Sequence, residues 1–200
     1  TDRWGDQSGN DNHMGQENVD QQAELTGGGF EFDGENDYYD LASPLSIGAS
    51  NPYTIFVVVN IDNYDTHNSI LGNVESEEGT QFITIRSAQQ VGIQQSTEAT
   101  ILNYPEEYFN ADETMVLCIT KTSGRLYEIY KNGGVLTTSS STQNPHAVSS
   151  GVFTANNIGV VGVDQVAPFA GNILEYGLYE RLLSATEIDS ISSYLVNKLL

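Results

Sequence analysis

The sequence predicts an all-β fold: a two-sheet antiparallel jelly-roll sandwich with a short C-terminal helix. Three observations predict it, namely many short segments of strand-like composition, turns marked by glycine between them, and helical periodicity only at the end of the chain. Strands that do not alternate with helices favour packed antiparallel sheets over a parallel sheet. The length of 200 residues favours one domain, residues 1–200.

Eight segments combine β-branched or aromatic residues with flanking turn residues, and several alternate with a period of two, most clearly residues 82–86. The expected strands are Phe30–Phe32, Thr54–Ile61, Ser69–Leu71, Gln81–Arg86, Met115–Lys121, Leu126–Lys131, Asn157–Val163 and Asn172–Tyr179. Asn132-Gly133 suits the positive φ angles of a tight turn, which predicts a hairpin between Leu126–Lys131 and Val135–Thr138.

The last part of the chain changes to helical spacing. Ser184 and Glu187 have the spacing of a capping box, in which each side chain accepts a hydrogen bond from the other residue's backbone. Apolar residues then recur along one helical face, at Ile188, Ile191, Leu195 and Leu199. We therefore expect a C-terminal amphipathic helix of about three to four turns.

Composition and charge exclude several classes of function. The chain has 27 acidic and 7 basic residues, a formal net charge of −20, so it lacks the basic face that nucleic acids and anionic membranes require. No apolar run is long enough to span a bilayer, and the first residues lack the pattern of a signal peptide. The lone Cys118 lies in an apolar run and is expected to be buried. Because the chain starts at Thr1, it is also compatible with a piece of a longer polypeptide.

Catalytic motifs are weak in this sequence. The one Glu-Ile-Asp, Glu187 to Asp189, resembles the start of the Glu-x-Asp-x-x-Glu strand of β-sandwich glucanases, but Ser192 replaces the last carboxylate and the segment reads as helix. The other acidic residues have no spacing that requires them to pair. The three histidines are far apart, and no Gly-x-Ser-x-Gly motif is present. Glycoside hydrolysis remains a residual alternative.

Calcium is the one cofactor that the sequence suggests. Asp6, Asn10 and Asp11 place carboxylate and amide oxygens on a glycine-containing loop, and calcium prefers oxygen ligands of this kind. The alternative is a network of Asx turns, in which the same side chains accept hydrogen bonds from their own backbone.

Tyrosine is abundant, with 11 residues. Tyr38, Tyr64, Tyr104 and Tyr108 lie in or beside predicted loops and are candidates for a ligand-binding surface. A tyrosine ring can stack on a sugar face and donate a hydrogen bond, but it serves protein interfaces and strand packing equally well.

An ordered series of motifs carries a resemblance that covers nearly the whole chain: Trp4-Gly5-Asp6-Gln7-Ser8-Gly9-Asn10, Phe30-Glu31-Phe32-Asp33-Gly34, Tyr53-Thr54-Ile55-Phe56-Val57, Tyr130-Lys131-Asn132-Gly133 and Gly171-Asn172-Ile173-Leu174-Glu175. In these motifs the chain resembles the concanavalin A-like lectin/glucanase superfamily, in its laminin-G-like branch of bacterial surface and phage structural proteins. The sequence departs from this pattern in two places. Only three residues precede Trp4, so an upstream first strand is expected to be missing, and Leu174 stands where many relatives have an acidic residue.

The resemblance implies a jelly roll that is usually non-enzymatic and belongs to proteins at cell or virion surfaces. The first hypothesis is a surface-displayed recognition or adhesion module that binds cell-surface glycans, as in a phage fibre or a bacterial surface protein. The second is a structural protein of a phage, a capsid decoration or fibre protein, whose jelly roll makes protein contacts and forms a homo-oligomer or part of a longer chain. Both imply an extracellular or virion-surface location.

Overall fold

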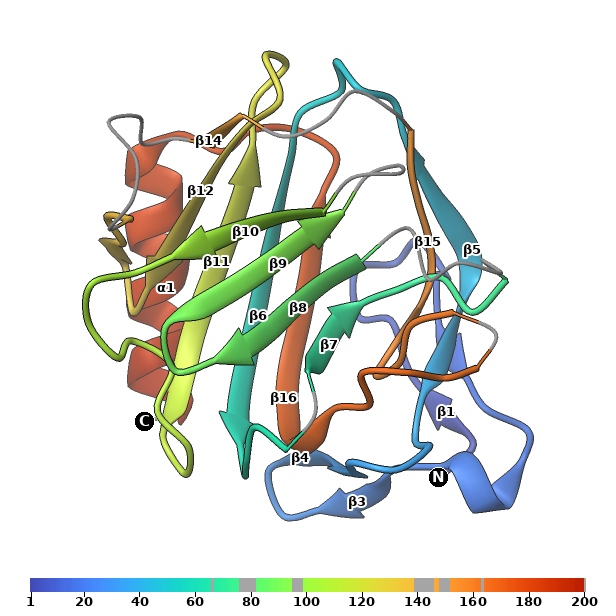
Figure 1. The fold of residues 1–200 in the computed structure, drawn as a ribbon. Coiled ribbons are helices and arrows are strands. Elements are labelled where there is room, and N and C mark those ends of the chain that lie inside the picture. Colours follow the sequence, from blue (N-terminus) through green and yellow to red (C-terminus); the bar gives the residue numbers. More distant parts are fainter. Residues whose placement is uncertain are drawn as a thin grey trace.

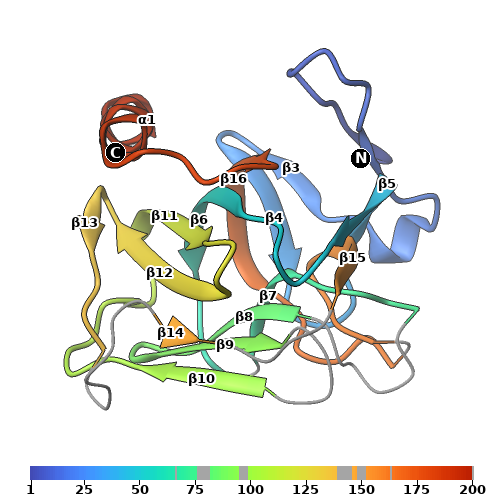
Figure 2. The same ribbon diagram turned by 90° about the horizontal axis from the view of Figure 1, so that it is seen from above.

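The structure of the chain is a computed structural model that describes residues 1–65, 67–75, 82–94, 99–138, 146–147, 152–162 and 164–199. Its strands form two layers that pack face to face, and the helix α1 (Ala185–Leu199) lies outside one of them (Figure 1 and Figure 2). The predicted all-β sandwich with one C-terminal helix is thereby confirmed. None of the described helices is long and apolar enough to cross a bilayer.

The layer beside α1, called here the back sheet, is antiparallel throughout the described residues. Its spatial order is β13 (Gly134–Val135), β12 (Leu126–Lys131), β11 (Thr114–Lys121), β6 (Tyr53–Ile61), β16 (Ala170–Tyr179), β4 (Gly29–Asp33) and β3 (Glu24–Thr26), and β14 (His146–Ala147) also pairs with β12.

The opposite layer, called here the front sheet, consists of two groups of antiparallel strands. One group runs in the order β10 (Ala99–Asn103), β9 (Gln90–Gln94), β8 (Phe82–Ser87) and β7 (Asn68–Leu71). The other runs in the order β15 (Phe153–Ile158), β5 (Tyr39–Ile47), β2 (Met14–Gly15) and β1 (Arg3–Trp4). An isolated bridge between Gly72 and Asn157 joins the two groups, and a short 3-10 helix (Val19–Gln21) precedes β3.

Strand β6 is buried on both of its faces. Ile55, Val57 and Val59 point into the sandwich core between the two sheets. Phe56 and Val58 point the other way, into a second apolar cluster beneath α1. This second cluster also contains residues of β11 and α1, namely Val116, Cys118, Ile188 and Leu195. The predicted burial of Cys118 and of the apolar helical face is confirmed.

The two predicted turn and cap motifs are also confirmed. Asn132 and Gly133 have φ angles of 50° and 86°, and they join β12 to β13 with Lys131 opposite Gly134. At the start of α1 the Ser184 amide donates to the Glu187 carboxylate at 2.8 Å, and the Glu187 amide donates to the Ser184 hydroxyl at 3.3 Å. The turn and the capping box therefore have, in the folded protein, the geometry that their short sequence motifs predict.

The predicted strand Asn157–Val163 is wrong in its bounds. Strand β15 begins earlier, at Phe153, and ends at Ile158, because Gly159 has a φ of 102°. A Cβ atom at Gly159 would lie 2.6 Å from the carbonyl oxygen of Asp37, so the chain turns where only glycine fits. Val163 lies outside the described residues.

Strand β5 was not predicted, and Pro44 accounts for this. Proline cannot donate a hydrogen bond to a ladder and argues against a strand. In the structure β5 tolerates Pro44 because β15 has a register shift between Ala155 and Asn157. The paired residues of β5 lie on either side of this shift, at Tyr39 and Asp40 and then from Leu45 onward.

Lys121 is fully buried at the end of β11 and fastens the connection between β5 and β6. Its ammonium group donates to the carbonyl oxygens of Ala49 at 2.8 Å, Asn51 at 2.7 Å and Gly48 at 3.4 Å. Burial, followed by the charge of Arg125, lowers the pKa of Lys121. The three carbonyl groups satisfy the donors of the ammonium group, which a buried cation requires.

We expect Lys121→Met to lower the free energy of unfolding by about 3 kcal/mol, because the carbonyl groups lose their donor inside the protein. Urea unfolding measures this. Lys198→Met is the control, since it removes a lysine whose side chain is 44% exposed and which forms a surface ion pair. That change should cost less than about 1 kcal/mol. Equal losses in the two variants would show that the ammonium group of Lys121 has no special role.

The capping box predicts how stability changes with acid. Hydrogen bonds from Arg181, and then from the Ser184 amide and hydroxyl, lower the pKa of Glu187 to about 2 from its ordinary value of 4.5. A carboxyl group with a lowered folded-state pKa contributes stability above the unfolded pKa, and this contribution is lost as the pH falls through the folded pKa. The advantage of the wild type over Glu187→Gln should therefore be full above pH 4.5 and vanish near pH 2.

Thermal unfolding at a series of pH values measures the difference between the two proteins. Glu180→Gln serves as the control, because it removes an exposed carboxylate next to Arg181 but outside the cap. A difference between wild type and Glu187→Gln that does not change with pH would contradict this account of the cap.

Candidate functional site

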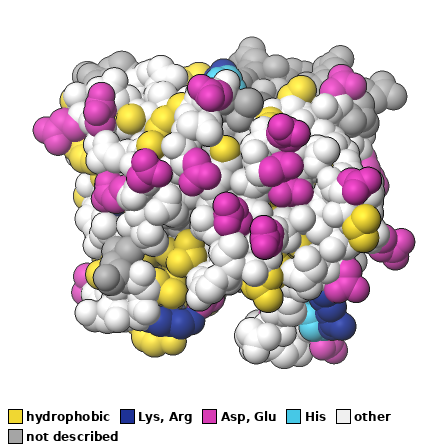
Figure 3. Space-filling model, turned by 90° about the horizontal axis from the view of Figure 1, so that it is seen from below, with side chains coloured by type: hydrophobic (Ala, Val, Ile, Leu, Met, Phe, Trp, Pro, Cys, Tyr) yellow, Lys and Arg dark blue, Asp and Glu magenta, His cyan; other side chains and the backbone are white. Residues whose placement is uncertain are grey.

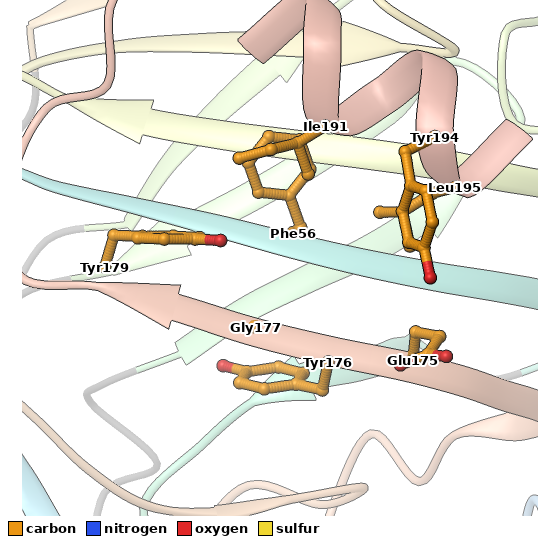
Figure 4. Close-up of a pocket in the computed structure, with 8 residues that line it drawn as sticks. All are labelled: Phe56, Glu175, Tyr176, Gly177, Tyr179, Ile191, Tyr194 and Leu195. Carbon is orange, nitrogen blue, oxygen red and sulfur yellow. The ribbon is translucent and has the colours of Figure 1, made fainter. Parts of the chain in front are cut away.

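A groove opens on the back of the molecule, between α1 and the end of β16, and encloses about 260 Å³. Figure 4 shows it from the side, with the side chains of α1 pointing down toward β16. The residues that line this α1–β16 groove are Phe56, Glu175, Tyr176, Gly177, Tyr179, Ile191, Tyr194 and Leu195.

The register of β16 determines which residues face the groove. A register shift in its pairing with β6 lies between Ile173 and Glu175. Ile173 and Tyr176 pack toward the sandwich core. Because side chains alternate along a strand, Gly177 and Tyr179 are then on the face that carries α1. The floor of the groove is thus a strand whose central outward residue is glycine.

Gly177 keeps the groove open. A Cβ atom at this position would have no heavy atom within 4 Å, so the space above the strand is empty. The φ angle of Gly177 is outside the positive region that favours glycine. The backbone therefore does not require glycine here, and a larger side chain would fill the groove without straining the strand.

Two exposed tyrosines stand on opposite sides of this floor. Tyr194 of α1 is 62% exposed and Tyr179 of β16 is 36% exposed. Phe56 supports Tyr179 by an edge contact, with ring centroids 6.2 Å apart. In Figure 4 the hydroxyl of Tyr194 is directed toward Glu175, whose carboxylate also forms an ion pair with Lys198. The groove thus offers aromatic faces together with hydroxyl donors and a carboxylate acceptor.

A second hollow, of about 350 Å³, lies on the side of the front sheet. Three separate segments form it, and its lining residues are Tyr64, Asp65, His67, Arg86, Val166 and Ala167. We call it the Arg86 pocket. It differs from the α1–β16 groove in being lined largely by polar and charged side chains.

The structure places the four tyrosines predicted from the sequence in different surroundings. Tyr64 lines the Arg86 pocket, and its hydroxyl donates to the carbonyl oxygen of Phe109. Tyr104 is 4% exposed and packs edge-on against Tyr108 and Phe109. Tyr38 is half-buried and contacts the N-terminal segment through its backbone. Three of the four therefore gather around Phe109, and Tyr38 lies elsewhere.

Tyr179, Tyr194 and Arg86 were not singled out from the sequence. One signal for Tyr194 was available, because it follows Ile191 by three residues and so lies at the border of the apolar stripe of the predicted helix. Tyr179 was placed at the end of a predicted strand, which says little about its neighbours. That these two rings face one groove depends on where α1 crosses the back sheet.

The candidate calcium loop is held by hydrogen bonds within itself. Both oxygens of the Asp6 carboxylate accept hydrogen bonds, from the Ser8 amide at 2.7 Å, the Ser8 hydroxyl at 2.9 Å and the Asn12 amide at 3.0 Å. These hydrogen bonds, that of the Ser8 amide above all, lower the pKa of Asp6. Asp11 has a φ of 56° and lies 3.6 Å from His13. This is the geometry of Asx turns, the alternative to a calcium site that the sequence also allows.

The acidic and histidine side chains do not gather elsewhere in the part of the chain that the structure describes. No group of three or more histidine, cysteine, aspartate or glutamate side chains in these residues could hold a metal ion. Glu187 of the Glu-Ile-Asp segment lies in α1, as expected, and its carboxylate is taken up by Arg181 and Ser184. Glu113 pairs with Lys131 at 2.6 Å. The side chain of His146 and the whole of Glu98 lie outside the described residues.

The family of the chain follows from its sequence as well as from this fold. Residues 33–189 match the family described as the concanavalin A-like lectin/glucanases superfamily, and the chain belongs to this superfamily. The resemblance seen in the motifs is thereby confirmed. No curated protein sequence matches the chain.

Solved structures with the same fold have low sequence identity to this chain. A heptameric SAP-like pentraxin from Limulus polyphemus matches with a TM-score of 0.60 and 12% identity over 82% of this chain and 80% of the pentraxin. The CBM40 of a Ruminococcus gnavus sialidase, bound to α2,3-sialyllactose, matches with a TM-score of 0.54 and 15% identity over 86% of this chain and all of that one (100%). A Trypanosoma rangeli sialidase matches with a TM-score of 0.61 and 16% identity, but this chain covers only 29% of it.

No group of acidic, histidine or cysteine side chains among the described residues could hold a metal ion, and the Asp6 carboxylate already accepts three hydrogen bonds within its own loop. We therefore expect calcium to leave the thermal unfolding midpoint unchanged within about 1 °C relative to a chelator. Asp6→Ala should lower that midpoint equally with and without calcium, because the loop loses its hydrogen bonds. A rise in midpoint that requires calcium and disappears in Asp6→Ala would instead establish the calcium site that the sequence suggested.

Proposed function

We propose that this chain is a non-enzymatic glycan-recognition module, displayed at a bacterial cell surface or on a phage virion. The observation that carries the proposal is the α1–β16 groove, where two exposed tyrosine rings flank an open glycine floor beside a carboxylate. Its volume of about 260 Å³ suits one or two sugar rings rather than a large ligand.

The chemistry of the groove matches that of a neutral sugar. A pyranose ring has an apolar C–H face, which packs against an aromatic ring, and hydroxyl groups at its edge. Tyr179 and Tyr194 offer the rings, and Glu175 offers carboxylate oxygens to the hydroxyl groups. None of the described residues that line the groove is basic, and the neighbouring Lys198 already pairs with Glu175, so these residues offer no cation to an acidic sugar. Neutral glycans are therefore the ligands that this groove favours.

The comparisons support recognition of glycans by this fold. The chain belongs to a superfamily that includes lectins, and the CBM40 with the same fold has been solved with sialyllactose bound. The heptameric pentraxin supports the further proposal that such a domain acts as a homo-oligomer. Several weak sugar contacts on one assembly would then act together.

The positions and partners of the carboxylates support a role in binding without catalysis. Glu187 and Asp189 lie on α1 rather than on a strand, and the carboxylate of Glu187 caps the helix. In the groove, Glu175 forms an ion pair with Lys198. A retaining glycosidase needs two carboxyl groups about 5 Å apart on either side of the scissile bond, and the lining residues of the groove include one.

A second function is favoured by the same exposed rings. Tyrosine is enriched in protein interfaces, so Tyr179 and Tyr194 would also suit a contact with another virion or surface protein. On this alternative the chain is a structural fibre or capsid decoration protein. A partner protein in the assembly, rather than a sugar, would then cover the two rings in the α1–β16 groove.

The groove proposal is tested by filling the groove. We expect Gly177→Val to abolish binding to the neutral glycans that the wild type selects on a glycan array, while the protein stays folded. Tyr194→Ala should weaken the same binding about fivefold, the loss of about 1 kcal/mol of ring contact. Isothermal titration calorimetry with a selected oligosaccharide measures both effects.

Tyr38→Ala provides the matched control, because it removes a half-buried tyrosine outside the groove. Its affinity should equal that of the wild type. Glycan binding that survives Gly177→Val would place the site elsewhere. If no glycan binds and Gly177→Val instead dissociates an oligomer in light scattering, the structural alternative holds.

A further inference from the structure

The Arg86 pocket has the features of a second binding site, on the opposite sheet from the α1–β16 groove. Arg86 belongs to β8 in the front sheet, whereas the groove lies beside α1, which covers the back sheet. Figure 1 shows β8 and α1 on opposite sides of the molecule. Residues near positions 65, 86 and 166 converge here from three separate segments. The pocket is also distinguished by its arginine, which forms no ion pair with a described carboxylate.

Arg86 lines a pocket and forms no ion pair with a described carboxylate. Arg3 and Arg125 also form none among the described residues, but neither lines this pocket. Four other basic residues have partners: Lys131 with Glu113, Arg181 with Glu187, Lys198 with Glu175, and Lys121 with three carbonyl groups. Arg86 has no ion pair with any carboxylate among the described residues, although the chain carries 27 acidic residues. Even Asp65, which lines the same pocket, does not form one. On the face drawn in Figure 3, acidic side chains clearly outnumber basic ones.

His67 holds the guanidinium group without neutralising it. The Nε of Arg86 donates to Nε2 of His67 at 3.3 Å, so this ring nitrogen must carry a lone pair. Burial, and then the charge of Arg86, lowers the pKa of His67, in agreement with an unprotonated Nε2 as the acceptor of this hydrogen bond. The hydrogen bond uses one of the five N–H donors of the guanidinium group. The two terminal nitrogens keep the parallel donors that grip a carboxylate in a bidentate pair.

The walls of the pocket are held rigidly. The ring of Tyr64 is fixed because its hydroxyl donates to the carbonyl oxygen of Phe109. On the other side Ala167 has a φ of 54°, an unusual conformation for alanine, and its carbonyl oxygen accepts from the Ser69 amide at 3.2 Å. Val166 is fastened by its bridge to Val161. Strained backbone persists where the surroundings hold it, and it concentrates at binding sites.

The charges of the pocket select the ligand. Arg86 requires an anionic group, whereas the nearby carboxylate of Asp65 repels a second negative charge and accepts hydrogen bonds from hydroxyl groups. A molecule with one carboxylate and several neighbouring hydroxyls satisfies both residues, and a dianion such as phosphate does not. The apolar surfaces of Tyr64 and Val166 add contacts for a ring. These requirements together describe a sugar acid.

We propose that the Arg86 pocket binds an acidic sugar, with the carboxylate of the sugar on the guanidinium group of Arg86 and its hydroxyls toward Asp65. This inference rests on the proposed glycan-recognition function and adds a second class of sugar at a second site. On this proposal neutral sugars bind in the α1–β16 groove, and acidic sugars bind in the Arg86 pocket on the opposite sheet.

The experiment uses the whole chain and amide chemical-shift titrations at pH 7.5, which detect weak binding and locate it. The probes are glucuronate and N-acetylneuraminate, with glucose and the methyl ester of glucuronate as neutral counterparts. We expect at least one of the two acids to shift the amides of Tyr64, Asp65, His67, Arg86, Val166 and Ala167, which line the pocket, and both neutral sugars to leave them unchanged. Arg86→Gln should weaken the binding at least tenfold, and Arg86→Lys should weaken it less.

Arg3→Gln is the matched control, because it removes the same charge from an exposed residue of β1 and should change the affinity less than twofold. His67→Gln tests the positioning role. Its amide oxygen can still accept from Arg86, so it should bind better than His67→Ala, in which the guanidinium group loses its anchor. Equal affinities in these two variants would remove His67 from the proposal.

Several outcomes would overturn the inference. Binding of neither acid, equal binding of glucose, or full binding by Arg86→Gln would each do so. Inorganic phosphate that binds at Arg86 as tightly as the sugar acid would make the pocket a general anion site. Gly177→Val separates this inference from the proposed groove: binding of the acid should survive in that variant, whereas binding of neutral glycans should not.

Discussion

The burial of β6 on both faces is the constraint on which the rest of the structure depends. A central strand of an ordinary sandwich needs apolar residues on one face only, and the other face meets water. Here Ile55, Val57 and Val59 fill the space between the sheets, while Phe56 and Val58 would be left exposed on the outside. The back sheet therefore requires a cover, and α1 supplies it through Ile188 and Leu195. The capping box at Ser184 and Glu187 starts the helix where the chain leaves β16.

The α1–β16 groove is a consequence of this cover. A helix with its side chains is about 10 Å wide, and neighbouring strands are about 4.8 Å apart, so one helix shields roughly two strands. In this fold those strands are β6 and β11, whose outward residues form the cluster beneath α1. The next strand, β16, keeps its outward face partly open along the side of the helix. Gly177 prevents that strand from filling the space itself, and Tyr179 and Tyr194 stand at its two sides. The same geometry that completes the core thus creates the candidate site.

The sequence predicts the parts of this structure that depend on local chemistry. The Asn132-Gly133 turn, the capping box and the strand expected at Thr54–Ile61 are each encoded within a few residues, and the motifs add the family. Strand β5 and the end of β15 could not be predicted, because a register shift accommodates Pro44 and a close approach of Asp37 demands Gly159. The sites depend on contacts that are more distant still. Tyr179 meets Tyr194 only through the position of α1, and Arg86 meets His67 only through the pairing of β7 with β8.

The strong acidity of the chain gives a reason for the division between the two candidate sites. Because the chain has a formal charge of −20, most of its surface repels an anionic ligand. Salt reduces this repulsion without removing it at contact distance. Such a ligand binds most favourably at a cation that lines a pocket and has no carboxylate partner. Lys121 is enclosed by carbonyl groups and Lys198 pairs with Glu175, so neither serves this purpose. Arg86 does, because its described anchor is a neutral imidazole rather than a carboxylate. A protein surface this acidic would otherwise favour neutral ligands, which is the chemistry that the α1–β16 groove offers.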